Sequence, residues 1–356
     1  MGGPLTRREV EVHLGILTGG GDAPGLNAVI RAVVYRAVAG GHDVTGFLRG
    51  WKGVLENVTR RLGIEDVRDI QKVGGTILLS SRTNPLKKEN GLRTIAETLK
   101  SNGIDCLIAI GGEDTLGVAS KLSAAGIRVL GVPKTIDNDL NATDCTFGFD
   151  TAINRVADSL DELETTAKSH ERAMVVEIMG RHAGWMALHG GIAGGAHIIL
   201  IPEASFDTNE VCEILKKRWA EGRRWALVAV AEGAMDEDLA EHVMHAEARD
   251  AFGHVQLGTG MGIGPILAHA IEDRTGIETR HVVLGHLQRG GPPSAFDRVL
   301  GTRLGAWVVE MAERGLTGKM VSLRGGEMAE VDLAEAVGTL RSVPLEQYRM
   351  AQVFFG

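Results

Sequence analysis

The sequence predicts an α/β protein with mainly parallel sheets, folded as two three-layer lobes. Apolar runs of strand length alternate with helical patterns along most of the chain, which is typical of this class. Almost every apolar run ends in glycine or polar residues, as strands do where they meet a ligand crevice. The chain of 356 residues is too long for one ordinary core, so about two domains are expected.

Composition narrows the class of function. The 48 glycines are about twice the usual share of ~7%, which indicates many tight turns suited to phosphate ligands. A net charge of −8 argues against broad affinity for nucleic acid or anionic membranes. The three cysteines have no C-x-x-C spacing, and no leader or apolar run of ~18 residues is present, so we expect a cytoplasmic protein with reduced thiols.

The chain begins with a strand, a glycine turn and a helix. Residues 1–9 are expected to be a loose start, and Val10 to Leu17 the first strand. The backbone amides of Gly20 and Gly21, with the N-terminus of the following helix, form a predicted site for a phosphoryl donor. An ordinary tight turn is an equally good interpretation of this glycine run.

Arg82 follows another apolar segment. We expect Thr76 to Ser80 to be a strand that ends beside Arg82, whose guanidinium would hold two phosphoryl oxygens at once. Considered by itself, Arg82 is better explained as a solvated loop residue.

The segment from Gly111 to Asp139 organises the rest. Two expected strands, Asp105 to Ile110 and Ile127 to Val132, break off into charged clusters. Because the carboxyl ends of parallel strands flank one crevice, these charged residues are expected to converge. They are Glu113, Asp114, Lys134, Asp137 and Asp139.

Four carboxylates and one lysine indicate metal-assisted phosphoryl transfer. Glu113 is the expected Mg²⁺ carboxylate, Lys134 would neutralise the transferring group, and Asp137 is the candidate base. A polar turn with a capping Asp is the alternative for residues 135–139.

The alternation continues to about residue 310. Expected strands cover Ala173 to Met179, Ala196 to Pro202, Trp225 to Ala231 and His281 to Leu284. Basic residues lie beside their ends, namely Arg172, Arg181, Arg280, His286 and Arg289. The loop that carries His286 and Arg289 is suited to a sugar phosphate. Each basic residue alone is better explained as a surface charge or a helix-end partner, but together they exceed what solubility requires. From Gly315 onward we expect a tail that contains helix.

Six motifs give the chain a close resemblance to the phosphofructokinases over about residues 11–310. They are TGGGDAPGLNAVIR (Thr18 to Arg31), GGTILLSSR (Gly74 to Arg82), GGEDT, PKTIDND (Pro133 to Asp139), VVEIMGRHAG (Val175 to Gly184) and GHLQRGG. The resemblance implies the phosphofructokinase fold with Rossmann-like lobes, and phosphorylation of fructose 6-phosphate on its 1-hydroxyl.

The resemblance also implies residue roles. Asp137 would accept the proton, Gly21 and Arg82 would bind the phosphoryl donor, and Glu113 would hold Mg²⁺. The sugar would contact Thr135, Asp137, Met179, Gly180, Arg181, Glu232, His286 and Arg289. Arg172 and Arg280 match positions that reach a neighbouring subunit's site, which implies a homodimer or homotetramer.

Departures from the family pattern concern the donor. Asp114 stands where relatives that use ATP carry glycine, and a carboxylate there would repel the α-phosphate of ATP. Lys134 would instead neutralise a compact pyrophosphate, so the resemblance favours the pyrophosphate-dependent branch. Tyr35 and Glu164 replace arginines of allosteric relatives, which implies little effector control.

Three alternatives remain at this stage. They are an ATP-dependent phosphofructokinase, a lipid or NAD kinase with a similar Gly-Gly-acid loop, and a sugar-phosphate sensor without turnover.

The expected domains follow the same resemblance. Residues 10–148 with 266–314 would form the donor lobe, residues 149–265 with 315–345 the fructose 6-phosphate lobe, and residues 346–356 a tail.

Overall fold

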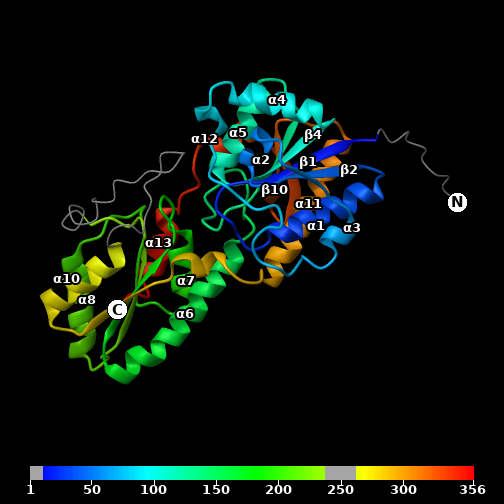
Figure 1. Cartoon of the computed structure of the whole chain (residues 1–356). Helices are drawn as coiled ribbons and strands as arrows, with labels where there is room; N and C mark the ends of the chain where they lie inside the picture. The colour runs from blue at the N-terminus through cyan, green and yellow to red at the C-terminus, as the bar shows by residue number, and fades with distance from the viewer. Residues whose placement is uncertain (1–10, 237–261) are drawn as a thin grey trace. The chain divides into compact units, whose positions relative to one another are not determined.

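The computed structural model describes residues 11–236 and 262–356, which form two compact units (Figure 1). The first unit comprises Met1–Lys134, Leu140–Phe147 and Gly291–Thr339, and the second comprises Thr135–Asp139, Gly148–Gly290 and Leu340–Gly356. The expected loose start at residues 1–9 lies outside the described residues.

The sheet of the first unit has, among the described residues, seven strands in the order β11-β10-β5-β4-β1-β2-β3. They are β1 (His13–Thr18), β2 (Asp43–Phe47), β3 (Thr59–Arg61), β4 (Cys106–Gly111), β5 (Val129–Pro133), β10 (Lys319–Arg324) and β11 (Glu327–Asp332). Only the outermost strands β3 and β11 pair antiparallel. The mainly parallel sheet agrees with the expected α/β class.

Helices cover both faces of this sheet. One core packs α1 (Leu26–Ala39), α3 (Ile64–Val67) and α11 (Ala295–Glu313) against one face. The other packs α2 (Trp51–Leu55), α4 (Gly91–Ser101), α5 (Glu113–Ala124) and α12 (Leu333–Gly338). Alternate residues of β4 enter the two cores, Ile108 one and Leu107 the other, because successive strand side chains point to opposite faces. The unit is therefore three-layered.

The second unit has, in the part of it that is described, a four-stranded parallel sheet in the order β7-β8-β6-β9. Its strands are β6 (Ala173–Ile178), β7 (Ile198–Leu200), β8 (Ala226–Ala231) and β9 (Thr279–Val283). The helices are α6 (Phe149–His170), α7 (Trp185–Ala193), α8 (Thr208–Ala220), α10 (Ile263–Thr275) and α13 (Leu345–Gln352). Helices α6 and α7 contact one another, as do α8 and α10.

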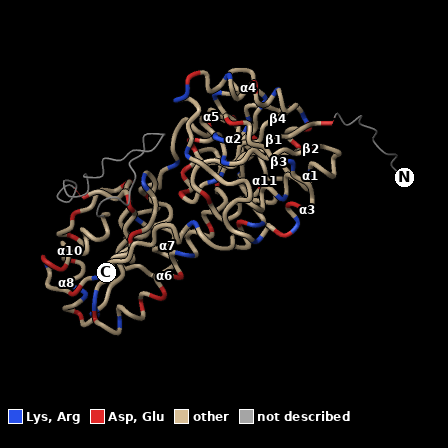
Figure 2. The backbone as a smooth tube through the Cα atoms, viewed as in Figure 1, with Lys and Arg blue, Asp and Glu red and all other residues tan. Residues whose placement is uncertain are grey.

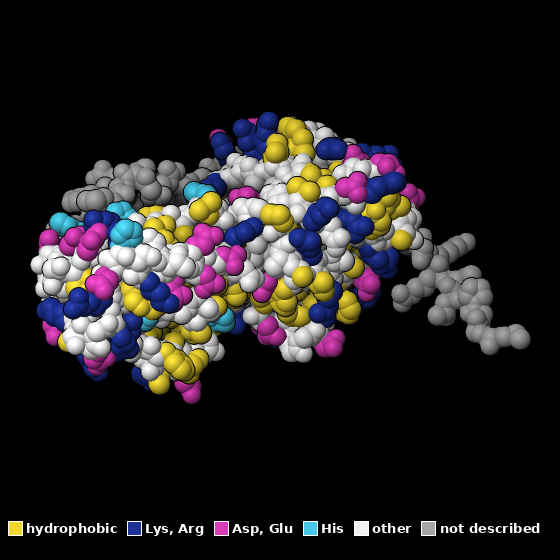
Figure 3. All heavy atoms as spheres, turned by 90° about the horizontal axis from the view of Figure 1, so that it is seen from below, with side chains coloured by type: hydrophobic (Ala, Val, Ile, Leu, Met, Phe, Trp, Pro, Cys, Tyr) yellow, Lys and Arg dark blue, Asp and Glu magenta, His cyan; other side chains and the backbone are white. Residues whose placement is uncertain are grey.

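The charged residues lie mostly outside the sheets. Figure 2 shows lysines, arginines and acids mainly on helices and loops, whereas the strands are mostly uncharged. On the face drawn in Figure 3 both signs are interspersed. Binding of an anion therefore depends on local groups of basic side chains. No helix within the described ranges combines the length and the hydropathy that a membrane span requires.

Two predictions about segments are wrong. Thr76 to Ser80 is irregular: Leu79 has a left-handed backbone (φ 59°), and the Leu78 amide donates to Thr76 Oγ1. The segment looks like a strand in sequence because Leu78 is fully buried in the first core. The chain from residue 315 onward also contains β10 and β11, and β10 pairs with β5.

The expected domain boundaries are also wrong in part. Residues 266–290 belong to the second unit, because β9 pairs with β6 there. Residues 315–339 belong to the first unit, because β10 extends its sheet. Residues 135–139 form part of the second unit although the sequence on both sides of them lies in the first.

Candidate active site

Three neighbouring strands of the first unit deliver one group of predicted residues. Strands β1, β4 and β5 are adjacent and parallel, with Thr18 opposite Ile110 and Gly111 opposite Pro133. The glycine turn, Glu113 and Lys134 therefore all follow strand ends on one edge of the sheet. We call Gly21, Arg82, Glu113, Asp114 and Lys134 the donor cluster.

Lys134 is the best-defined member of the donor cluster. Its side chain is buried, and Nζ donates to the Gly21 carbonyl oxygen at 2.6 Å. A Cβ built on Gly20 would lie 3.5 Å from the same Nζ, so the glycine turn closely approaches the ammonium. A buried ammonium requires polar partners, and the carbonyl supplies one.

The turn itself differs from the expected phosphate cradle. The Gly19 amide donates to Ile110 O at 2.9 Å and the Gly20 amide to Ser81 O at 3.3 Å. The Gly20 amide is thus engaged by the backbone, and its expected contact with a phosphoryl donor stays a prediction. The bond to Ser81 also ties the turn to the segment that carries Arg82, which is exposed.

Glu113 and Asp114 are the first two residues of α5, which begins two residues after the end of β4. Both are half-buried in the first helical turn, where carboxylates are stabilised by the helix dipole. Thr115 behind them is buried and packs under Gly19 and Gly111, where any Cβ would lie within 2.5 Å of its side chain. The helical turn that carries the two acids is therefore closely packed against the glycine residues that follow β1 and end β4.

The second unit brings together another group around the ends of β6 and β8. The Glu232 amide donates to Ile178 O at 2.8 Å, and the Gly233 amide to Gly180 O at 3.2 Å. These bonds place Glu232 beside the segment Met179, Gly180 and Arg181. A Cβ on Gly233 would lie 1.9 Å from Arg181 O, so only glycine permits this approach.

The charge of Asp137 acts on Glu232. Burial and, second to it, the neighbouring charge of Asp137 raise the pKa of Glu232 to about 7. The Asp137 amide donates to Thr135 Oγ1 at 3.1 Å, which fixes the loop. We call Thr135, Asp137, Met179, Gly180, Arg181, Glu232, His286 and Arg289 the acceptor cluster.

The GHLQRGG loop is bonded to the end of β6. Its η2 turn (Gly285–Arg289) carries Gln288, which is buried and accepts from the Met179 amide at 3.2 Å. His286 is exposed on the same turn. Arg289 Nε is buried without a hydrogen-bond partner among the described residues.

Arg172 and Arg280 lie at the edge of the same sheet. Strand β9 is an outer strand, and Arg280 stands opposite Met174 of β6. Arg172 immediately precedes β6, and its Nε is also buried without a partner in the described part of the chain. Both arginines contact Glu278, at 3.5 Å from Arg172 and 3.0 Å from Arg280.

The sequence model of the protein family Phosphofructokinase matches residues 13–312 of this chain. The chain belongs to the phosphofructokinase family. It is 56% identical to a pyrophosphate–fructose 6-phosphate 1-phosphotransferase of Amycolatopsis methanolica, over 97% of this chain and all of the relative. It is 48% identical to an ATP-dependent 6-phosphofructokinase of Streptomyces coelicolor, over 97% of this chain and all of that relative.

A solved phosphofructokinase supports the fold. The pyrophosphate-dependent phosphofructokinase from Marinobacter aquaeolei aligns with a TM-score of 0.81 and 25% identity, over 94% of this chain and 86% of that one. The family and the fold class expected from the sequence are therefore confirmed.

Sequence reasoning did not single out two buried residues that lie beside the acceptor cluster. One is Gln288. The other is Glu177 on β6, which is buried and accepts from the Gly264 amide at 2.8 Å, at the start of α10. Burial raises the pKa of Glu177, and its charge contributes to the raised pKa of Glu232. An ionisable residue inside the apolar run from Ala173 to Ile178 was the available signal.

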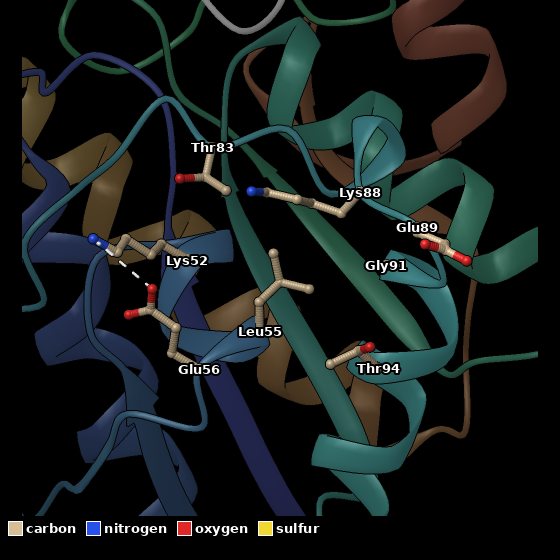
Figure 4. A pocket seen from close by; sticks show the side chains of 8 residues that line it. All are labelled: Lys52, Leu55, Glu56, Thr83, Lys88, Glu89, Gly91 and Thr94. Carbon is tan, nitrogen blue, oxygen red and sulfur yellow. Dashed lines mark ion pairs between the residues drawn. The ribbon is translucent and has the colours of Figure 1, made fainter.

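A separate pocket of about 360 Å³ lies in the first unit between α2, α4 and the residues on either side of η1 (Pro85–Lys87). Figure 4 shows Leu55 at its centre, with Thr83 and Lys88 on one side and Thr94 on the other. Lys52 and Glu56 pair across one wall at 3.9 Å. None of the predicted site residues lines this pocket.

Proposed function

We propose that the chain transfers a phosphoryl group reversibly between pyrophosphate and the 1-hydroxyl of fructose 6-phosphate. The observation that carries the choice of donor is the donor cluster, where a half-buried carboxylate at Asp114 and a buried ammonium at Lys134 follow adjacent strand ends. The name of the 56% identical Amycolatopsis relative supports the same choice.

The charges of the donor cluster discriminate between a compact phosphoryl donor and a larger nucleotide. Pyrophosphate is compact, and the Lys134 ammonium neutralises its terminal phosphoryl group while Arg82 takes two further oxygens. A nucleotide would have to place its α-phosphate against Asp114, where two negative charges repel one another in partly desolvated surroundings. The cluster therefore favours the inorganic donor.

The acids of α5 fit Mg²⁺. Within the described residues no group of three or more His, Cys, Asp or Glu side chains forms a metal cage. Mg²⁺ in phosphoryl-transfer enzymes is commonly bound by one or two carboxylates, with phosphate and water oxygens completing the shell. Glu113 would hold it in this way, and the ion would supply charge neutralisation at the transferring phosphoryl group.

Asp137 performs the proton transfer. Its carboxylate accepts the proton of the sugar 1-hydroxyl as that oxygen bonds to the terminal phosphorus of pyrophosphate. The bond from that phosphorus to the bridging oxygen breaks, and inorganic phosphate leaves. The two products are fructose 1,6-bisphosphate and phosphate, and the reverse reaction uses the same groups.

The remaining residues of the acceptor cluster hold the sugar. Thr135 and the segment Met179, Gly180 and Arg181 contact its body together with Glu232, while His286 and Arg289 contact its far end and 6-phosphate. Arg172 and Arg280 complete the phosphate contacts from a neighbouring subunit, so the active form is a homodimer or a homotetramer.

The donor is tested by steady-state rates with pyrophosphate and with ATP, each at saturating fructose 6-phosphate and Mg²⁺. We expect the value of kcat/KM with pyrophosphate to exceed that with ATP by at least ~100-fold, the size of about 2.7 kcal/mol in transition-state binding. The ATP-dependent enzyme is the second candidate, because relatives with that name are 48% identical. The reverse preference would establish it.

A further inference from the structure

Glu278 bridges the two arginines of the sheet edge. One oxygen of its carboxylate, Oε1, lies 3.0 Å from Arg280 Nη2 and 3.5 Å from Arg172 Nη2. The pairing of β6 with β9 sets up this arrangement: Ala173 stands opposite Thr279, and the Ala173 amide donates to the Glu278 carbonyl at 3.0 Å. The contact is therefore built on the register of the sheet.

The charges at this edge cancel. Arg280 also lies 3.6 Å from Glu272 of α10, so two guanidinium groups face two carboxylates and their formal charges sum to zero. An incoming phosphate group therefore finds no net positive charge unless a carboxylate moves away. Glu278 is 43% exposed, which allows its carboxylate to move into water at low cost.

We propose that Glu278 is a specificity residue that competes with the substrate's phosphate group for Arg172 and Arg280. The inference rests on the proposed function, in which these arginines bind the 6-phosphate. A phosphate dianion offers each guanidinium two oxygens, whereas Glu278 offers both arginines the same one. The phosphorylated sugar therefore displaces the carboxylate, and an uncharged sugar does not.

The competition fixes the sign of the expected effect. Glu278→Gln removes the negative charge and leaves the arginines a net positive charge, so the KM for fructose 6-phosphate should fall. An exposed ion pair is worth about 0.2–1 kcal/mol, which corresponds to a decrease of about 1.5- to 5-fold. The effect should shrink as NaCl is added, because salt screens exposed charges.

Two variants serve as controls. Glu278→Asp keeps the negative charge and should retain more of the original KM than Glu278→Gln does. Glu221 is 44% exposed and is paired with Arg223 in the same unit, so Glu221→Gln removes an equivalent ion pair away from the edge strand. It should leave the KM for fructose 6-phosphate unchanged. All variants should leave the KM for pyrophosphate unchanged.

Arg172→Ala and Arg280→Ala separate this inference from the proposed function. If neither raises the KM for fructose 6-phosphate, the assigned role of the arginines fails, and the inference about Glu278 falls with it. If they raise it and Glu278→Gln leaves the KM unchanged or increases it, the competition is overturned while the function stands. A decrease in KM with Glu278→Gln alone, in a variant whose thermal unfolding matches the parent, supports the proposal.

Discussion

Lys134 and Gly21 are 113 positions apart in the chain, yet Nζ and the carbonyl oxygen are 2.6 Å apart. The lysine is buried, so its charge is weakly screened by water and acts strongly on any anion beside the glycine turn. The proposed function assigns the selectivity for compact anions to the two carboxylates of Glu113 and Asp114, which lie in the first turn of α5.

Donor choice is testable at a single residue. Asp114→Gly should weaken the use of pyrophosphate and, combined with Lys134→Gly, should admit ATP, because the repulsion of the nucleotide's inner phosphate is removed. The measurement is kcat/KM for each donor in the parent, the single variant and the double variant.

The control for this change is Glu210→Gly. Glu210 is an exposed acid in the first turn of α8, so its replacement has a similar cost to helix stability without touching the donor cluster. An unchanged donor preference in the Asp114 variants would contradict the role of Asp114.

The raised pKa of Glu232 predicts that binding of fructose 6-phosphate depends on pH. Its pKa is raised from 4.5 to about 7, so its carboxyl is largely neutral below that value and ionised above it. Above about pH 7 a second negative charge then stands near Asp137. The KM for fructose 6-phosphate should increase as the pH rises through this value, and Glu232→Gln should not show this increase.

Stability provides an independent readout of the same group. The folded state retains the proton of Glu232 up to about pH 7, whereas the unfolded state loses it near 4.5. The folded state binds more protons in this window, so Glu232 makes the free energy of unfolding decrease as the pH rises across it. The free energies of unfolding in urea, measured as a function of pH, should diverge between the parent and Glu232→Gln from about pH 4.5 to 7. Parallel pH profiles would contradict the raised pKa of Glu232.

At the scale of elements, strand ends position the candidate site. Parallel strands end on one edge of a sheet, so Glu113 and Lys134 of the first unit could be grouped from the sequence pattern. Met179 and Glu232 of the second unit were placed by the family resemblance. The prediction of a strand from Thr76 to Ser80 was wrong. Its apolar residues indicate burial, but burial of Leu78 is achieved by an irregular segment that side-chain hydrogen bonds hold in place.

Two helical glycines predict opposite effects of the same substitution. A Cβ on Gly117 of α5 meets nothing within 4 Å, so Gly117→Ala should raise the free energy of unfolding by about 0.5–1 kcal/mol. A Cβ on Gly190 of α7 would lie 2.5 Å from Val156 of α6, so Gly190→Ala should lower it by about 1–3 kcal/mol. Thermal unfolding measures both, and equal shifts would contradict the packing of α6 on α7.

At the scale of the whole molecule, the chain passes between its two units at five peptide bonds. The crossings follow residues 134, 139, 147, 290 and 339. The donor cluster belongs to the first unit and the acceptor cluster to the second, and the bond from Lys134 to Thr135 joins them covalently. Neither unit is a continuous piece of sequence, so neither can be obtained by a single truncation.

The proposed sharing of sites between subunits predicts complementation. Asp137→Asn would remove the proposed base and Arg280→Ala a proposed phosphate contact, so each variant should be impaired alone. If Arg280 serves a neighbouring subunit, mixed oligomers contain some sites with both residues intact. Co-expression of two differently tagged variants, followed by tandem purification, should recover activity above that of either variant, and no recovery would argue against sharing.

The sequence by itself determined the α/β class, the family and the residues at the ends of the central strands. These follow from local periodicity and from motifs such as PKTIDND, which need no knowledge of long-range packing. Only the tertiary structure decided that β10 joins the first sheet, that Lys134 contacts Gly21, and that Glu278 engages both edge arginines. Sheet order and register depend on how residues far apart in sequence bury their apolar faces together, and no local pattern encodes that choice.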